Sequence, residues 1–201
     1  MKEYKREYPL FSLCGLNCGL CPRYQTQGLS KCPGCGGKDF RRKHPTCAVM
    51  TCNEKHDAVE YCFQCSSYPC QRYRKPSTGD SFISYRNVIA DLKRASREGI
   101  DKYKRELSEK VEILEFLIKN HNDGKRKNFY CIAVNLLPLA DIERIKERIE
   151  KNISQQEIGM KDRIALIIDL FESMAKKKNL DLRLRKKPPV FREARNHSRA
   201  E

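Results

Sequence analysis

Apolar residues recur at helical spacing through the second half of the chain. In four stretches they lie three or four positions apart, as on a helix with one buried face: 82–92, 100–118, 142–153 and 160–175. Residues 129–137 are apolar on most sides, and we interpret them as a short buried helix rather than a strand. The pattern therefore predicts a bundle of helices whose apolar faces pack together.

The first third of the chain shows no such period. Its larger apolar residues are scattered, and ten of the eleven cysteines lie between Cys14 and Cys70. A segment this short rarely builds a sufficient core from side chains alone. We therefore expect a mainly α protein, in which a small irregular cysteine-rich metal-binding module is followed by an α-helical bundle.

The cysteines are spaced like metal ligands. A gap of two residues recurs three times, and gaps of three and four residues separate other pairs. A Cys-x2-Cys turn directs two thiolates at one ion, and two such turns complete a tetrahedral zinc shell. Structural zinc contributes roughly 10–16 kcal/mol of binding energy in small domains. The predicted ligands are Cys14, Cys18, Cys21, Cys32, Cys35, Cys47, Cys52, Cys62, Cys65 and Cys70.

The division of these ligands between sites stays open at this point. We expect one site to consist of Cys18, Cys21, Cys32 and Cys35. A second site would draw on Cys47, Cys52, Cys62 and Cys65, with Cys14 and Cys70 as alternates. His44 and His56 lie in the same stretch and are alternative zinc ligands, although exposed turns explain both more simply.

Four motifs in this stretch resemble a known family. They are Cys-Gly-Leu-Asn-Cys-x2-Cys from Cys14, Cys-Pro-Gly-Cys from Cys32, Cys-Ala-Val-Met-Thr-Cys from Cys47 and Cys-x2-Cys-x2-Tyr-Pro-Cys from Cys62. The ordered set is similar to domain-of-unknown-function family 3795, small cysteine-rich proteins of bacteria and archaea. The resemblance covers residues 14–70 and implies metal binding in a prokaryotic cytosolic protein, but it implies no particular activity.

An iron–sulfur cluster is the main alternative to zinc. Cys14, Cys18 and Cys21 have the spacing with which radical S-adenosylmethionine enzymes bind a cluster, and such a cluster would indicate redox or enzymatic work. The bacterial ferredoxin run is absent, however, and one cluster would use at most four of the ten cysteines. A disulfide framework is a further alternative, because the number is even. We favour structural zinc and expect about two ions per chain.

Three local features add to this prediction. Gly15, Asn17 and Gly19 favour tight, partly left-handed turns around the first three cysteines. Residues 180–184 alternate leucine with charged residues, which predicts a short strand. Cys131 lies in the most apolar segment and is expected to be a packed core thiol rather than a ligand.

The net charge of +15 is concentrated near the C-terminal end. Residues 176–201 contain 10 basic and 3 acidic side chains. The basic tail could contact the phosphates of a nucleic acid, although solubility is the simpler explanation of its charge. The sequence has no nucleotide-binding glycine loop and no Gly-x-Ser-x-Gly elbow, so it assigns no enzymatic activity.

We divide the chain into a cysteine-rich module at residues 1–75, a helical domain at 82–185 and a basic, disordered tail at 186–201. Residues 71–81 are expected to be a linker. The expected function is that of a zinc-stabilised binding or regulatory module with an unidentified protein partner. No apolar run approaches the roughly 20 residues of a membrane span, and the charged N-terminus has no export segment. We therefore expect a cytoplasmic protein without membrane contact.

Overall fold

The computed structural model describes residues 4–44, 46–56, 58–74, 77–155 and 159–186, with the side chains of 153–155 excepted. The described part is mainly α, as predicted, and contains no strand. Its α-helices are α1 Phe40–Lys43, α2 Ala48–Glu54, α3 Gln71–Arg74, α4 Val88–Glu98, α5 Ile100–Asn120, α6 Lys127–Leu136, α7 Leu139–Gln155 and α8 Met160–Lys177. Two short 3-10 turns, η1 Cys18–Leu20 and η2 Cys62–Gln64, lie within the cysteine-rich stretch.

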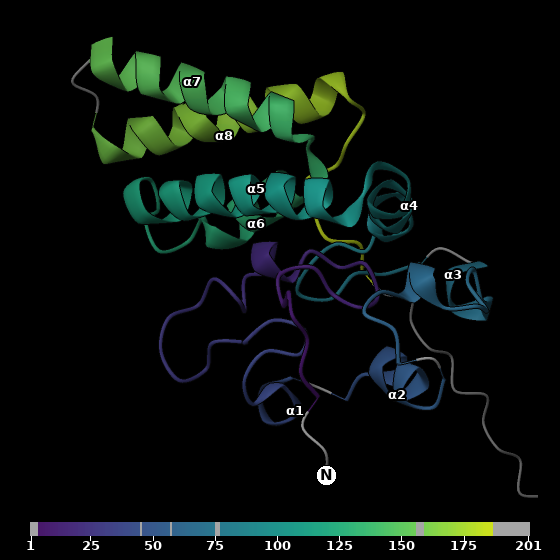
Figure 1. The fold of residues 1–201 in the computed structure, drawn as a ribbon. Helices are drawn as coiled ribbons and strands as arrows, with labels where there is room; N and C mark the ends of the chain where they lie inside the picture. The colour runs from purple at the N-terminus through teal and green to yellow at the C-terminus, as the bar shows by residue number, and fades with distance from the viewer. Residues whose placement is uncertain (1–3, 45, 57, 75–76, 156–158, 187–201) are drawn as a thin grey trace, which may run out of the picture.

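The long helices form tiers above the cysteine-rich stretch (Figure 1). The helices α7 and α8 pack against each other in one tier, and α5 and α6 form the next, with α4 against α5. The cysteine-rich loops with α1, α2 and α3 lie on the other side of α5 and α6, where η1 contacts both helices. The short helix α3 occupies the start of the region that the sequence predicted as a linker.

The helix α5 is at the centre because its apolar stripe is wide enough to meet several neighbours. Its buried side chains recur at helical spacing and include Tyr103, Leu107, Val111, Leu114 and Leu117. Fully burying an apolar side chain of this size stabilises a fold by about 1.5–3 kcal/mol. The predicted stripes of α5, α7 and α8 are therefore confirmed, except that Met160 at the start of α8 is exposed and the side chain of Ile153 lies outside the described residues. The helical state of residues 129–136 is confirmed as well.

The apolar core is continuous between the cysteine-rich stretch and the long helices. Phe11 and Tyr61 belong to the same buried cluster as the side chains of α4 to α8. The ring of Phe11 lies 4.5 Å from the ring of Tyr103 on α5. The predicted boundary between residues 1–75 and 82–185 stays a prediction, but the two parts share one core.

The chain directly before α4 is not helical, contrary to the prediction of a helix from residue 82. The helix begins only at Val88. Asp80 explains the delay, because its Oδ1 accepts a hydrogen bond from the backbone N–H of Tyr85 at 2.9 Å. Side-chain acceptors of this kind compete with helical backbone bonds.

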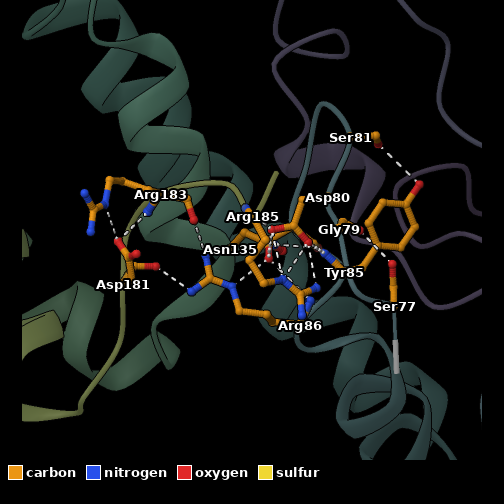
Figure 2. Close-up of polar contacts among 11 residues, drawn as sticks. Ser77, Gly79, Asp80, Ser81, Tyr85, Arg86, Asn135, Asp181, Arg183 and Arg185 are labelled. Atoms are coloured by element: carbon orange, nitrogen blue, oxygen red, sulfur yellow. Dashed lines mark hydrogen bonds and ion pairs between the residues drawn. The ribbon is translucent and has the colours of Figure 1, made fainter. Parts of the chain in front are cut away.

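The strand predicted at residues 180–184 is also wrong. Leu182 is buried and its charged neighbours are exposed, so the alternation reports burial correctly. The backbone of residues 180–184, however, hydrogen-bonds with a side chain instead of another strand. The guanidinium of Arg86 donates to the carbonyl oxygens of Asp181 at 2.5 Å and Arg183 at 2.7 Å (Figure 2).

The Asp80 carboxylate joins the C-terminal segment 180–186 to the region before α4 through contacts with Arg185 (Figure 2). Its side chain is fully buried, and its Oδ1 lies 2.8 Å from Nη2 of Arg185. The backbone N–H of Arg185 donates to Oδ2 of Asp80 at 2.9 Å. Burial opposes ionisation of Asp80, but the hydrogen bonds from Arg185 and Tyr85 outweigh it and lower the pKa of Asp80 to about 2.

The predicted tail lies almost wholly outside the described residues. Only the exposed Lys186 is described, so the disorder of residues 186–201 and their contact with nucleic acid stay predictions. Among the described residues, no helix has the length and apolar character needed to cross a membrane. The cytoplasmic location stays a prediction.

Gly15 allows the first cysteine motif to approach α4 closely. Its φ is +91°, which confirms the predicted left-handed turn at this position, whereas Asn17 has a φ of −81°. A Cβ atom at Gly15 would lie 2.6 Å from Cγ of Leu92, which is fully buried. Both the backbone conformation and the close contact therefore require glycine here.

Gly15→Ala should lower the free energy of unfolding by about 2–4 kcal/mol, because backbone strain and overpacking add. Gly28→Ala is the matched control: its φ is +83°, but no atom lies within 4 Å of a Cβ atom there. The control should lose only the strain component, about 1–2 kcal/mol. Urea denaturation of both variants measures the difference, and equal losses would show that the contact with Leu92 is not tight.

Arg185→Ala should destabilise the protein strongly, because it leaves the buried carboxylate of Asp80 without its guanidinium. Breaking a buried ion pair in this way costs about 3–5 kcal/mol. Arg183→Ala is the control, since its side chain is 86% exposed and pairs with the exposed Asp181. The control should cost under about 1 kcal/mol. Denaturation midpoints that shift equally in the two variants would contradict the structural role of Asp80.

Candidate metal centres

All ten predicted ligands lie in the described part of the chain, and none forms a disulfide. Cys32 and Cys35 are buried, and the other eight are half-buried. Cys131 is 1% exposed and packs in the helical core, as its surroundings in the sequence predicted. The ten ligands fall into two groups.

Four cysteines line one small pocket between α2, η2 and α3. The four-cysteine pocket is lined in part by Cys52, Cys62, Cys65 and Cys70. Its volume is about 30 Å³, somewhat more than the roughly 10–15 Å³ that one water needs. His56 also lines it and is exposed. The pocket therefore has room for one ion-sized occupant among four thiols.

The thiols of this pocket are close enough to influence one another's ionisation. The pKa of Cys62 is raised to about 11, mainly by burial and further by the charges of Cys70, Cys65 and Cys52. A hydrogen bond with Tyr73 acts in the opposite direction. Thiolates crowded in this way repel one another, so their joint ionisation requires a compensating positive charge such as a metal ion.

The six remaining ligands form a second group, which is linked through Cys14 and Cys18. The six-cysteine group consists of Cys14, Cys18, Cys21, Cys32, Cys35 and Cys47. Cys18, Cys35 and Cys47 pack against the small buried cluster that contains Leu13 and Phe40. Burial raises the pKa of Cys14 to about 12, and the charges of Cys35 and Cys47 add to the rise.

Cys18 lies near four other members of the six-cysteine group. Burial holds its pKa well above the usual range, and the charges of Cys35, Cys14, Cys21 and Cys32 contribute in that order. Cys18 is therefore near the partners that the sequence predicted, and also near Cys14. The second predicted site is divided, because its other members line the four-cysteine pocket while Cys47 belongs here.

Backbone hydrogen bonding favours ionisation of two thiols of this group. Hydrogen bonds from the backbone of Arg23 and Tyr24 lower the pKa of Cys21 against the larger effect of burial. The backbone of Leu13 acts on Cys35 in the same way. Such bonds favour the thiolate form, which is the form that binds metal.

A buried cation, Arg6, lies beside the six-cysteine group. Arg6 is 5% exposed, and its guanidinium donates to the carbonyl oxygens of Phe11 at 2.8 Å and Glu60 at 2.7 Å. It also forms an ion pair with the Glu60 carboxylate at 2.9 Å. Burial raises the pKa of Cys35, but the charge of Arg6 and a hydrogen bond from it lower that pKa.

Nothing in the sequence indicated this role of Arg6. It lies among other basic residues in a segment without periodicity. One structural signal sits at Gly36, where a Cβ atom would lie 2.6 Å from Cγ of Arg6. Gly36, next to the predicted ligand Cys35, therefore leaves the space that the aliphatic part of the Arg6 side chain occupies.

The thiols of neither group point at a common centre. Among the described residues, no group of three or more Cys, His, Asp or Glu side chains is arranged so that it could hold a metal ion. His44 stacks on Phe40 at 4.5 Å between ring centroids. Metal binding in either group therefore requires the thiols to turn toward one point.

A buried polar network joins the first cysteine motif to three helices. Asn17 lies between Cys14 and Cys18 and is 4% exposed. Its Nδ2 donates to Oδ2 of Asp91 on α4 at 3.1 Å and to Oδ1 of Asn135 on α6 at 3.2 Å. Its Oδ1 accepts from the hydroxyl of Tyr103 on α5 at 2.9 Å.

Two ionisable groups of this region have shifted pKa values. Burial raises the pKa of Asp91 to about 6, against the charges of Lys110 and Arg94. Burial lowers the pKa of Lys110 to about 8, and its Nζ donates to the carbonyl oxygens of Val134 at 3.1 Å and Leu137 at 2.6 Å. Shifted values also occur in active sites. Here the hydrogen bonds join structural elements, so we interpret the groups as structural.

Asp91 should make stability depend on pH. Its pKa is about 6 in the folded protein and about 3.8 in the unfolded chain. The folded state therefore keeps a proton that the unfolded state has lost, so the contribution of Asp91 is fully present below pH 3.8 and is lost as pH rises through 6. Asp91→Asn should flatten the fall in unfolding free energy over this window.

Urea denaturation at pH 4, 5, 6 and 7 measures this effect as the difference between Asp91→Asn and the parent protein. Loss of metal at low pH affects both proteins alike and cancels in the difference. Asp101→Asn is the control, because Asp101 lies in the first turn of α5 and its side chain is 81% exposed. A difference for Asp91→Asn that does not change with pH would contradict the buried, protonated carboxyl.

Residues 10–75 match the model of one protein family, described as "Protein of unknown function (DUF3795)". The match confirms the resemblance of this segment, which is about a third of the chain. No curated protein and no solved structure matches the chain.

Proposed function

We propose that this chain is a zinc-binding protein, in which zinc fixes the cysteine-rich stretch on the helical part. The four-cysteine pocket is the observation that supports this most strongly. Four thiols from separate motifs line a space of about 30 Å³, which suits one ion. Four thiolates are the complete shell of a structural zinc ion.

The size of the pocket favours zinc over an iron–sulfur cluster. A four-iron cluster is a cube of eight atoms, which needs far more room than about 30 Å³. A single ion would need only the four thiols to turn toward it. The spacing of Cys14, Cys18 and Cys21 still allows a cluster in the six-cysteine group, so the metal must be identified there separately.

Charge supports a second ion in the six-cysteine group. A zinc ion with four thiolates has a net charge of −2, and burying that charge is costly without a nearby cation. Arg6 provides one, because it is buried and its charge lowers the pKa of Cys35. Backbone donors to Cys21 and Cys35 reduce the cost further.

The proposed role is binding or regulation rather than catalysis. A zinc ion with four thiolate ligands has no open position for water or substrate, so it acts by holding the chain in place. The zinc would then stabilise the helical part through the shared core, and that part presents a surface to a partner.

Protein purified without oxygen should contain about two zinc ions per chain and no visible chromophore. Cys65→Ser should remove one equivalent, from the four-cysteine pocket, and Cys35→Ser should remove another. Cys131→Ser is the matched control and should keep both, because it replaces a core thiol outside the groups. Elemental analysis and a visible spectrum measure these outcomes.

A brown preparation with iron in place of zinc would show that the cluster alternative is correct. Full metal content in both Cys65→Ser and Cys35→Ser would contradict the proposal. Cys32→Ser and Cys47→Ser then identify the fourth ligands of the six-cysteine group. Loss in Cys32→Ser supports the set predicted from the sequence, whereas loss in Cys47→Ser supports ligands drawn from Cys14, Cys18, Cys35 and Cys47.

A further inference from the structure

A second, larger pocket lies where the cysteine-rich stretch meets the helices. Its volume is about 390 Å³, within the roughly 300–1,000 Å³ range of small-molecule sites. Four parts of the chain contribute to its wall: the first cysteine motif, the α2–α3 region, the segment leading into α4 and the C-terminal segment. The lining residues are Cys14, Val49, Arg72, Tyr73, Ser77, Tyr85, Arg86, Val88, Ile89 and Arg185.

The charges of this pocket, which we call the junction pocket, are all positive. Arg72, Arg86 and Arg185 line it, and no acidic residue does. Arg185 is paired with Asp80, whose carboxylate also attracts Arg86. Asp80 therefore offsets part of the charge of Arg185 and Arg86 but not that of Arg72, and an excess of positive charge remains at the pocket.

The guanidiniums keep hydrogen-bond donors for a ligand. A guanidinium has five N–H donors, and those of Arg86 are directed in part at the carbonyl oxygens of Asp181 and Arg183. Arg185 uses Nε and Nη2 on Asp80. Arg72 is exposed and pairs with no other residue in the described part of the chain. Arg72 is thus the side chain best able to bind an anion.

The hydroxyl groups add one more donor. The hydroxyl of Tyr73 donates to the carbonyl oxygen of Cys14 at 3.3 Å, and that of Ser77 donates to Gly79 at 2.6 Å. Their protons are therefore used within the fold. The hydroxyl of Tyr85 instead accepts from Ser81 at 3.2 Å, so its own proton remains available (Figure 2).

The rest of the wall is apolar. Val49, Val88 and Ile89 contribute aliphatic surface, and the two tyrosines contribute rings. A bare inorganic ion would leave this surface uncovered. A ligand that combines an anionic group with a flat or branched apolar part matches both halves of the wall.

We propose that the junction pocket binds a small organic anion, with a phosphate or carboxylate group on Arg72 and an apolar part against Val49, Val88 and Ile89. This site adjoins the proposed zinc sites, because Val49, Arg72 and Tyr73 also line the four-cysteine pocket and Cys14 belongs to the six-cysteine group. Binding at a junction of four segments would stabilise their arrangement, because the complete pocket exists only when all four are in place.

The test is a titration of the full chain, as purified, followed by amide chemical shifts in a ¹H–¹⁵N spectrum. The probes are phenyl phosphate, benzoate, inorganic phosphate and benzyl alcohol. We expect phenyl phosphate or benzoate to give saturable shifts at the residues around α3 and the start of α4. Inorganic phosphate, which lacks the ring, and benzyl alcohol, which lacks the charge, should bind at least about tenfold more weakly. The stronger of the two anions identifies the preferred acidic group.

Arg72→Ala should weaken binding of the preferred anion by about tenfold or more, because it removes a charge-assisted contact. Arg74→Ala is the matched control, since it removes the same charge from the same helix and does not line the pocket. Both side chains are exposed, so both variants should fold. Equal affinities of the two variants, shifts confined to other surfaces, or binding of benzyl alcohol as strong as that of the anions would overturn the proposal.

Discussion

The buried amide of Asn17 is the contact on which the relation between the cysteine-rich stretch and the helices depends. Its nitrogen donates to α4 and α6, and its oxygen accepts from α5. Loss of the hydrogen-bond partner on any one of these helices would leave a buried polar group unsatisfied, which costs about 1–3 kcal/mol. Apolar packing would tolerate several orientations of η1 on these helices, whereas this hydrogen-bond set is satisfied in only one.

The position of Asn17 also links the metal ligands to the bundle. It lies between Cys14 and Cys18, so the orientation that satisfies its amide fixes the direction in which these thiols leave the chain. Arg6 acts on the same group at Cys35, because it is buried and its charge lowers the pKa of that thiol. Metal binding in the six-cysteine group would therefore stabilise the helical part as well as the loops around it.

The sequence predicted the elements whose burial repeats with helical spacing. It missed the local structure that depends on side chains distant in the sequence. The stripes of α5 and α7 and the buried α6 follow from spacing alone, because burial repeats with the helix. The late start of α4 depends on the Asp80 carboxylate, and the backbone of residues 180–184 depends on Arg86, which is about a hundred positions away. Spacing showed that the cysteines belong together, but not which of them meet, since their loops have no repeat.

The junction pocket shows how one buried carboxylate can organise a surface. The low pKa of Asp80 means that it stays charged through the physiological range, so Arg185 and the C-terminal segment are attached whenever the protein is folded. Cys14 lines the same pocket and belongs to the six-cysteine group. If metal binding turns this thiol toward an ion, the wall of the pocket changes with it. Thermodynamic reciprocity then requires that an anion in the pocket alters metal affinity by the same factor.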